Sequence, residues 1–239
     1  MIYKNIVEAR FLSRPNRFIA HCETGGKEVA AHVRNTGRCR ELLVPGATVY
    51  LETSDNKNRK TGYSLITVKK GRRLVNMDST APNKVMKEAL EKSGFSLPGL
   101  GALTFIKPET RFDESRFDLY LEAGEQKSFL EVKGVTLEEK GVALFPDAPT
   151  ERGVRHMEEL IKAKAEGFGA YLVFIVQMKG VNFFSPHTMM HPDFSSTLRT
   201  AYERGVRILC FDCRVTKNSL TLADPVPVKL PGIDGFISL

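Results

Sequence analysis

The sequence predicts a mixed α/β protein of two domains, a small β-barrel over residues 1–80 and an α/β domain with a central mixed sheet over residues 81–239. The first observation is that short apolar runs separated by turn residues fill the first eighty positions. The second is that helical stripes alternate with apolar runs of strand length in the rest of the chain, a pattern typical of helices packed on a sheet. A length of 239 residues also favours two domains.

Five strands are expected in the first domain. Their runs are EARFLSRPNRFIAHCE, KEVAAHVRN, ATVYLETS, YSLITVKKG and RRLVNM, and the turn signals between them include Gly25, Gly26, Pro45 and Gly46. Short strands at this spacing are typical of a barrel of the OB type, whose face and loops commonly hold oligonucleotides.

A polar linker over residues 78–83 and a helix open the second domain. Asn83 is a candidate N-cap for this helix, an apolar stripe at helical spacing lies within residues 85–90, and Gly94 can end it. We therefore expect the domain boundary near residue 80.

Strands and helices alternate through the remainder of the chain. The strand-like runs ALTFIKPETRF, RFDLYLE and SFLEVKGVTLEE precede a helix that Thr150 can cap and Gly167 can end. The apolar run AYLVFIVQM predicts a strand covered on both faces, and the helix DFSSTLRTAYERG separates it from a last strand, VRILCFDCRV. The order αβββαβαβ predicts a mixed sheet with helices on both faces.

The composition excludes several classes of protein. Hydrophobic residues form 42% and charged residues 26% of the chain, as in soluble globular proteins. No apolar run approaches the about 20 residues that span a bilayer, and the first segment lacks the apolar core of a signal peptide, so we expect a cytoplasmic protein without a membrane partner. Cys210 and Cys213 form one Cys-x-x-Cys pair without a second pair, which favours buried structural thiols over a zinc or redox site.

The positive charge is confined to the first domain. Residues 1–80 contain 15 Lys and Arg against 7 Asp and Glu, whereas residues 81–239 contain 20 against 21. A basic domain joined to a neutral one that bears carboxylates suits a polyanionic partner, namely DNA, RNA or both. A merely basic soluble domain is the alternative.

Arginine and asparagine side chains gather in two segments of the first domain, SRPNRF and HVRNTGRCR, with Phe11 and Phe18 interleaved. Arginine contacts to phosphates combined with aromatic stacking on bases are the usual means of holding a single strand. Alternatively, at least one of these phenylalanines belongs to the barrel core. The nucleic-acid-binding residues expected in this domain are Arg14, Asn16, Arg17, Arg34, Asn35 and Arg38.

Charged residues also interrupt two apolar strands of the second domain. Asp118 lies in RFDLYLE, and Glu131 and Lys133 lie in LEVKG, 13 and 15 positions later. Since positions i and i+2 of a strand share a face, Glu131 and Lys133 point the same way. Desolvating such charges costs several kcal/mol unless they are paired or bind a metal, so the pattern indicates either a catalytic site or a surface salt-bridge cluster.

This order of a helix, a strand with Asp, a strand with Glu-x-Lys and a further helix resembles the core of PD-(D/E)XK nucleases. The blocks NTGRCRELL, SRFD, EVKGVTL and FPDAPTERGVRHMEEL resemble the sugar fermentation stimulation protein A family over nearly the whole chain. The resemblance implies an OB-like first domain, a nuclease-like second domain and nucleic-acid binding.

The nuclease reading assigns a role to each charged residue. Asp118, Glu131 and the carbonyl of Val132 would supply oxygen ligands to Mg²⁺ or Mn²⁺, because two carboxylates and water suffice for such ions. Lys133 would hold or help deprotonate the attacking water. Glu109 matches a further acidic position of the family pattern and would act at a second ion or water, with Glu88 as its rival.

The helix start at Thr150 adds two candidate contacts to nucleic acid. Arg152 and His156 are one helical turn apart, at the end of a helix where phosphates bind readily. Capping alone also explains Thr150 and Glu151.

The predicted function is therefore nucleic-acid binding with divalent-metal-dependent hydrolysis of phosphodiester bonds in DNA or RNA. The alternatives are a non-catalytic DNA-binding regulator of sugar utilisation that retains the nuclease fold, and a hydrolase of another phosphorylated substrate. The oligomeric state stays open, a homodimer included.

Overall fold

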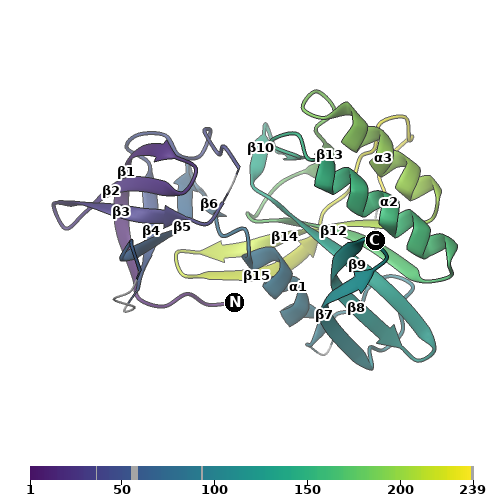
Figure 1. The fold of residues 1–239 in the computed structure, drawn as a ribbon. Coiled ribbons are helices and arrows are strands. Elements are labelled where there is room, and N and C mark those ends of the chain that lie inside the picture. Colours follow the sequence, from purple (N-terminus) through teal and green to yellow (C-terminus); the bar gives the residue numbers. More distant parts are fainter. Residues whose placement is uncertain (36, 55–58, 93, 238–239) are drawn as a thin grey trace.

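The computed structural model describes residues 1–35, 37–54, 59–92 and 94–237. It has two lobes, a barrel lobe built from the first six strands and an α/β lobe built from the rest of the chain (Figure 1). This confirms the predicted fold class.

The barrel lobe is a six-stranded sheet that closes on itself. The strand order is β3-β2-β1-β4-β5-β6, and an additional parallel pairing of β3 with β5 closes the first five strands into a barrel. Apolar side chains that point inward fill it, among them Phe11, Val49 and Leu65, each at most 2% exposed. The strands are β1 (Ile6–Asn16), β2 (Ile19–Thr24), β3 (Lys27–Val33), β4 (Thr48–Thr53), β5 (Tyr63–Lys70) and β6 (Arg73–Asn76).

One strand prediction in this lobe is wrong. The run EARFLSRPNRFIAHCE was expected as one strand, but it folds back as the hairpin β1–β2, in which Asn16 pairs with Ile19. The Asn16 side chain makes the turn possible, because its Oδ1 accepts the N–H groups of Phe18 (2.9 Å) and Ile19 (3.1 Å). The barrel is therefore complete without RRLVNM, whose strand β6 extends β5 toward the α/β lobe.

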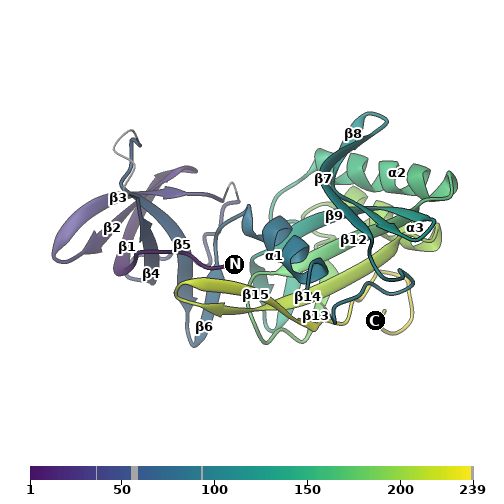
Figure 2. The same cartoon turned by 90° about the horizontal axis from the view of Figure 1, so that it is seen from below.

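The α/β lobe is a mixed six-stranded sheet with helices on both faces. The order is β15-β14-β12-β9-β8-β7, in which β9, β12 and β14 are parallel and the other pairs are antiparallel. Helix α1 covers one face, and α2 and α3 cover the other (Figure 2). The elements are α1 (Ala81–Leu90), β7 (Phe105–Phe112), β8 (Ser115–Ala123), β9 (Gln126–Val135), α2 (Glu151–Ala165), β12 (Gly169–Val176), α3 (Pro192–Glu203), β14 (Arg207–Thr216) and β15 (Ser219–Pro225).

A small second sheet, absent from the sequence prediction, faces the barrel lobe. It consists of β10 (Leu137–Glu139), β11 (Val142–Phe145) and β13 (Phe183–Pro186). Glu138 in this sheet is buried, and its carboxylate forms ion pairs with Lys70 and Arg73 of the barrel lobe, each at 3.0 Å. The basic turn at 69–73 therefore contributes to the contact between the lobes.

Of the two N-caps that the sequence predicts, one is present. Thr150 caps α2, since its hydroxyl accepts the N–H of Gly153 at 3.1 Å, as predicted. Asn83 was expected to cap α1, but the helix begins at Ala81 with Pro82 in its first turn, where proline is favoured. Asn83 is thus inside the helix, and its side-chain amide donates to Asp118 Oδ1 at 2.6 Å.

A buried polar network, which we call the junction network, joins the lobes where a polar linker was expected. Asp78, fully buried, accepts hydrogen bonds on Oδ2 from Tyr3 (3.3 Å) and Arg34 (3.2 Å). The amide of Gln177, at the end of β12, donates to Asn76 Oδ1 (3.0 Å) and to the carbonyl of Asp78 (3.0 Å). The connection between the lobes is therefore hydrogen-bonded and buried.

The first three residues cross from the barrel lobe to the α/β lobe. The N–H of Tyr3 donates to the carbonyl of Asn218 (2.8 Å), and the N–H of Leu220 donates to the carbonyl of Met1 (3.1 Å). The N-terminus accordingly lies beside β15 and α1 in both views (Figures 1 and 2). This terminal strap is a second link between the lobes.

The cysteine prediction is confirmed. All four thiols are free and buried. Burial raises the pKa of Cys22 to about 11 and that of Cys39 to about 12, so neither thiol ionises near neutral pH. Within the described residues, no helix has the length and apolar character needed to cross a membrane.

Candidate catalytic cluster and arginine pocket

The strands β8 and β9 separate where the predicted catalytic residues begin. Their pairing runs from Ala123 opposite Gln126 to Leu119 opposite Leu130. Beyond that point Asp118 Oδ2 accepts the backbone N–H of Val132 at 2.8 Å. The Asp118 carboxylate thus takes the place of a strand carbonyl and is held against β9, next to Glu131.

Asp118 has a carboxylate that resists ionisation. Burial and the nearby negative charge of Glu131 raise its pKa from 3.8 to about 6, although the Val132 N–H, Lys133 and Asn83 favour the charged form. Two neighbouring carboxylates in a partly desolvated site repel each other, and a bound cation would reduce that repulsion.

Glu131 is 3% exposed and uses one oxygen for two partners. Its Oε1 accepts a hydrogen bond from Lys133 Nζ at 2.6 Å and another from His156 Nδ1. Burial raises the pKa of Glu131, but the hydrogen bonds from His156 and Lys133 and the positive charge of Lys133 outweigh it, and the pKa lies below its ordinary value. Its Oε2 is buried and has no hydrogen-bond partner among the described residues.

His156 is held in one tautomer by its two neighbours. Arg152 Nε donates to its Nε2 at 3.2 Å, and since a guanidinium only donates, the ring proton is on Nδ1, facing Glu131. The imidazole is 6% exposed and packs edge-to-face on Phe117. The contact of His156 with nucleic acid stays a prediction, and in the structure its buried ring holds Glu131.

The structure brings together Asp118, Glu131, Lys133 and His156, which we call the candidate catalytic cluster. Glu131 and Lys133 share a face of β9, as the strand geometry predicted. Arg152 is exposed at the start of α2, next to the cluster.

The two further acidic candidates have other partners. Glu109, on β7, is 63% exposed and pairs with Arg116 at 3.6 Å across the β7–β8 hairpin. Glu88 pairs with the ammonium group of Met1 at 2.6 Å and so holds the terminal strap. Neither contacts Asp118 or Glu131 through a hydrogen bond or ion pair in the described part of the chain.

The cluster fits a hard divalent cation with few protein ligands. Over the described ranges, no group of three or more His, Cys, Asp or Glu side chains is arranged to hold a metal ion. The cluster itself offers two carboxylates, those of Asp118 and Glu131. Among the described residues, the buried Oε2 of Glu131 has no hydrogen-bond partner. Mg²⁺ keeps several waters and needs only one or two carboxylates, so the donor set suits this ion or Mn²⁺.

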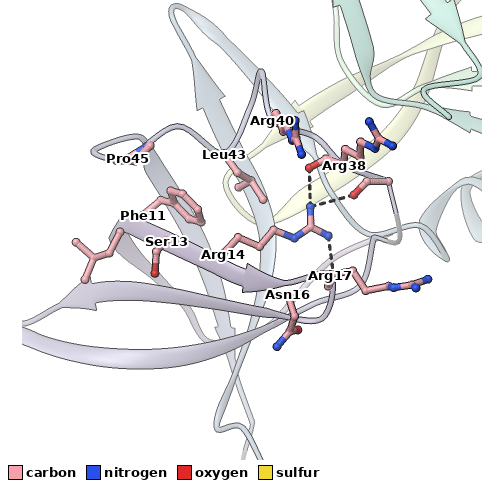
Figure 3. A pocket seen from close by; sticks show the side chains of 11 residues that line it. Phe11, Ser13, Arg14, Asn16, Arg17, Arg38, Arg40, Leu43 and Pro45 are labelled. Atoms are coloured by element: carbon pink, nitrogen blue, oxygen red, sulfur yellow. Dashed lines mark hydrogen bonds between the residues drawn. The ribbon is translucent and has the colours of Figure 1, made fainter. Parts of the chain in front are cut away.

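The barrel lobe has a hollow of ≈ 590 Å³, which we call the arginine pocket (Figure 3). Four of the predicted nucleic-acid-binding residues line it. Arg40, in the same basic segment, also lines it. The lining residues are Phe11, Leu12, Ser13, Arg14, Asn16, Arg17, Gly37, Arg38, Arg40, Leu43 and Pro45.

Arg14 organises this pocket through the hydrogen bonds of its guanidinium to the backbone. Its guanidinium donates to the carbonyls of Arg17 (2.7 Å), Asn35 (2.7 Å), Arg38 (2.8 Å) and Gly37 (2.9 Å), as Figure 3 shows in part. The side chain therefore fastens the loop after β3 to the β1–β2 hairpin. The structure thus gives Arg14 a structural role, and its contact with nucleic acid stays a prediction.

Three other predicted contacts are also engaged inside the barrel lobe. Asn16 forms the β1–β2 turn described above. Asn35 is 9% exposed, and its Oδ1 accepts the N–H of Gly37 at 2.8 Å. Arg34 pairs with Asp78 at 3.2 Å and with Glu52 at 3.8 Å. These contacts fix the β1–β2 turn and the loop after β3, while the nucleic-acid contacts of the three residues stay predictions.

Arg17 and Arg38 keep exposed side chains at the pocket. The Arg17 guanidinium lies 5.6 Å from the ring centre of Phe18, which is 51% exposed, whereas Phe11 is 2% exposed. The interpretation that one phenylalanine belongs to the core is confirmed for Phe11.

Comparisons with known proteins agree with this architecture. The family model described as "SfsA N-terminal OB domain" matches residues 12–77, and "Sugar fermentation stimulation protein RE domain" matches residues 80–219. A sugar fermentation stimulation protein homolog of Desulfitobacterium hafniense (strain DSM 10664 / DCB-2) is 58% identical over 230 residues, 96% of this chain and 99% of that protein. A homolog of Ruminiclostridium cellulolyticum is 50% identical over 96% of this chain and 100% of that protein.

A solved structure shares both lobes. It is described as Pyrococcus furiosus SfsA in complex with Ca²⁺, with a TM-score of 0.85 and 30% sequence identity, covering 96% of this chain and 98% of that one. The two family matches together cover most of the chain, and the relatives are similar over nearly their whole length. The chain therefore belongs to the sugar fermentation stimulation protein (SfsA) family.

Proposed function

We propose that this protein binds nucleic acid and hydrolyses its phosphodiester bonds at the candidate catalytic cluster with the help of Mg²⁺ or Mn²⁺. The observation that carries the proposal is the buried Oε2 of Glu131, which has no hydrogen-bond partner in the part of the chain that the structure describes, beside the carboxylate of Asp118. Leaving such negative charge uncompensated costs several kcal/mol, which a fold tolerates where a cation balances it.

The residues of the cluster have distinct tasks. Asp118 and Glu131 would hold the ion, which when bound polarises a phosphate oxygen and lowers the pKa of water. Lys133, with a side chain 14% exposed, donates from the same face as Glu131 and would orient the attacking water or a phosphate oxygen. Arg152, exposed at the start of α2, would contact an adjacent phosphate.

Two further observations support the proposal. The related protein of Pyrococcus furiosus is described in complex with Ca²⁺, a cation that binds carboxylate oxygens. The barrel lobe is of the OB type and lies within the basic third of the chain, which suits a polyanion.

A non-catalytic DNA-binding protein is the second candidate. The observation in its favour is that Glu131 Oε1 is already paired with Lys133 and His156, which compensates part of the buried charge without an ion. In that reading the cluster is a structural remnant, and only the barrel lobe acts on DNA.

Cleavage assays separate the two candidates. Labelled single- and double-stranded DNA and RNA are incubated with the full chain in Mg²⁺, Mn²⁺ or EDTA, beside the variants Asp118→Asn and Glu131→Gln. We expect metal-dependent cleavage by the wild type, none by either variant, and retained binding in EDTA by all three. Binding without cleavage by the wild type establishes the second candidate, and equal cleavage by the variants refutes the assigned residues.

A further inference from the structure

The arginine pocket has an apolar floor and a cationic rim. Phe11 and Leu43 on the floor are 2% and 7% exposed, whereas Arg17, Arg38 and Arg40 on the rim are exposed. A volume of ≈ 590 Å³ lies within the roughly 300–1,000 Å³ of small-molecule sites. An apolar floor can pack against the flat face of a base, and guanidinium groups donate hydrogen bonds to phosphate oxygens, so the pocket suits one nucleotide.

The tip of the β1–β2 hairpin adds a stacking surface beside the pocket. Phe18 is 51% exposed although it is a large apolar side chain, and Arg17 lies over its ring at 5.6 Å. An exposed aromatic ring paired with a guanidinium is the arrangement on which unpaired bases stack.

A second, smaller hollow adjoins the arginine pocket at Gly37 and reaches β9, the strand that carries Glu131 and Lys133. Gly37 lines both the arginine pocket and a polar hollow of ≈ 170 Å³ between the lobes. On its other side that hollow is lined by Gly134, the residue after Lys133, and by Asp147. Glycine at 37 leaves room for the Asp147 carboxylate, because a Cβ there would be 2.1 Å from Asp147 Oδ2 and the carboxylate would have to shift.

We propose that the arginine pocket binds an unpaired nucleotide and that the substrate is a single strand, which runs from this pocket past Gly37 to the strand that carries Lys133. This rests on the proposed function, since it names the substrate class of the same site. A duplex keeps its bases paired and stacked, so it offers the pocket only its backbone, whereas a single strand offers base faces and phosphates together.

Equilibrium binding tests the inference independently of cleavage. The full chain is titrated in EDTA against fluorescent oligothymidylate and oligouridylate of equal length, and against a duplex of that length, over a series of salt concentrations. We expect tighter binding of both single strands than of the duplex. Arg38→Ala and Arg40→Ala should each flatten the log–log salt dependence for single strands by about 0.7, the value of one phosphate contact.

Two variants sharpen the readout. Phe18→Ala should weaken single-strand binding roughly 5-fold or more, as expected for the loss of one stacked base, and leave the salt dependence unchanged. Arg10→Ala is the matched control, because Arg10 is on β1, outside the pocket, and pairs with Glu23 at 2.8 Å. It removes the same charge from the same lobe and should change single-strand binding little.

Two results would overturn the inference: a duplex bound as tightly as the single strands, or Arg38→Ala and Arg40→Ala indistinguishable from Arg10→Ala. Failure of the proposed hydrolysis gives a different pattern. In that case the wild type binds single strands through the pocket in EDTA, as inferred, and cleaves nothing in Mg²⁺ or Mn²⁺.

Discussion

His156 binds Glu131 through one ring nitrogen and Arg152 through the other, so a single imidazole connects an exposed arginine to a buried carboxylate. Groups of this kind orient a metal-binding carboxylate without touching the substrate, and their loss commonly costs 10- to 100-fold in activity or metal affinity. On the proposed function, His156 is therefore a positioning residue.

Replacing this histidine should lower turnover more than substrate binding. We expect His156→Ala to reduce kcat about 10-fold or more with little change in KM, and to weaken Mn²⁺ binding measured by calorimetry. His156→Asn keeps an N–H donor near Glu131 and should recover part of both losses. Arg155→Ala, an exposed neighbour on α2, serves as the control. Unchanged Mn²⁺ affinity in His156→Ala would show that the contact orients nothing.

Asp118 should make the metal-free protein less stable as the pH rises. Burial and Glu131 raise its folded pKa from 3.8 to about 6, so between these values the folded state binds the extra proton and loses stability with increasing pH. Asp118→Asn removes this penalty. Relative to the wild type, its free energy of unfolding in EDTA should therefore improve by up to about 3 kcal/mol between pH 4 and pH 7. Urea titrations at both pH values measure this, and a pH-independent difference would contradict it.

Patterns in the sequence predicted that Asp118, Glu131 and Lys133 lie close together, because alternation along a strand determines which side chains share a face. The same patterns could not predict the contact between His156 and Glu131. Helical periodicity shows that His156 lies on a buried face of its helix, but it does not show which strand residue the side chain contacts. Arg14 shows the same limit. Its four acceptors are backbone carbonyls brought near only by the folded loop, so its sequence context resembles that of a phosphate contact.

At the scale of elements, α2 carries both Arg152 and His156, and its first turn depends on one cap. Thr150 accepts the Gly153 N–H at 3.1 Å, and its own N–H donates to His191 Nδ1 at 3.3 Å. The position of the cluster therefore depends on the way this helix begins.

Removing the cap should cost both stability and activity. Thr150→Ala is expected to lower the free energy of unfolding by about 1 kcal/mol, the usual cost of losing a threonine cap, and to reduce turnover because the first turn frays. Thr200→Ala, an exposed position on α3, should cost less than about 0.5 kcal/mol. Urea unfolding measures both, and equal effects would show that the cap is dispensable.

Long elements were predictable and short ones were not. The helix after Thr150 and the apolar strand β12 are long enough, and regular enough in their apolar pattern, to be assigned as helix and strand from the sequence. The strands β10, β11 and β13 have only three or four residues each, too few to show a period, and they form through a neighbour distant in sequence, as in the parallel pairing of Val142 with Phe183. The β1–β2 turn was missed although Pro15 and Asn16 are turn residues, because the rest of the run has the character of one continuous strand.

For the whole molecule, the junction network decides whether the lobes behave as one unit. Asp78 is fully buried and its carboxylate accepts from Tyr3, Arg34 and Thr80, while Gln177 binds its carbonyl from the other lobe. Buried networks of this kind are costly to break, because the remaining partners stay desolvated.

Asp78→Ala should therefore destabilise the protein strongly and separate the unfolding of the lobes. We expect a loss of about 3–5 kcal/mol, as for removal of one partner of a buried ion pair, with two calorimetric transitions in place of one. Glu52→Ala removes the more distant partner of Arg34, at 3.8 Å, and should cost less than about 1 kcal/mol. A single transition with a small shift in Asp78→Ala would contradict the role of the network.

The terminal strap has a consequence for synthesis on the ribosome. Met1 and Leu220, which hydrogen-bond to each other, are 219 positions apart in the chain. At a translation rate of about 5–20 residues per second, the strap waits roughly 10–40 s before its partners in β15 are made. The barrel can close during this interval, since its strands are all encoded before residue 77. Residues 1–3, however, must remain undocked until the last hairpin of the α/β lobe emerges, so they are among the latest residues to reach their native position although they are translated long before their partners.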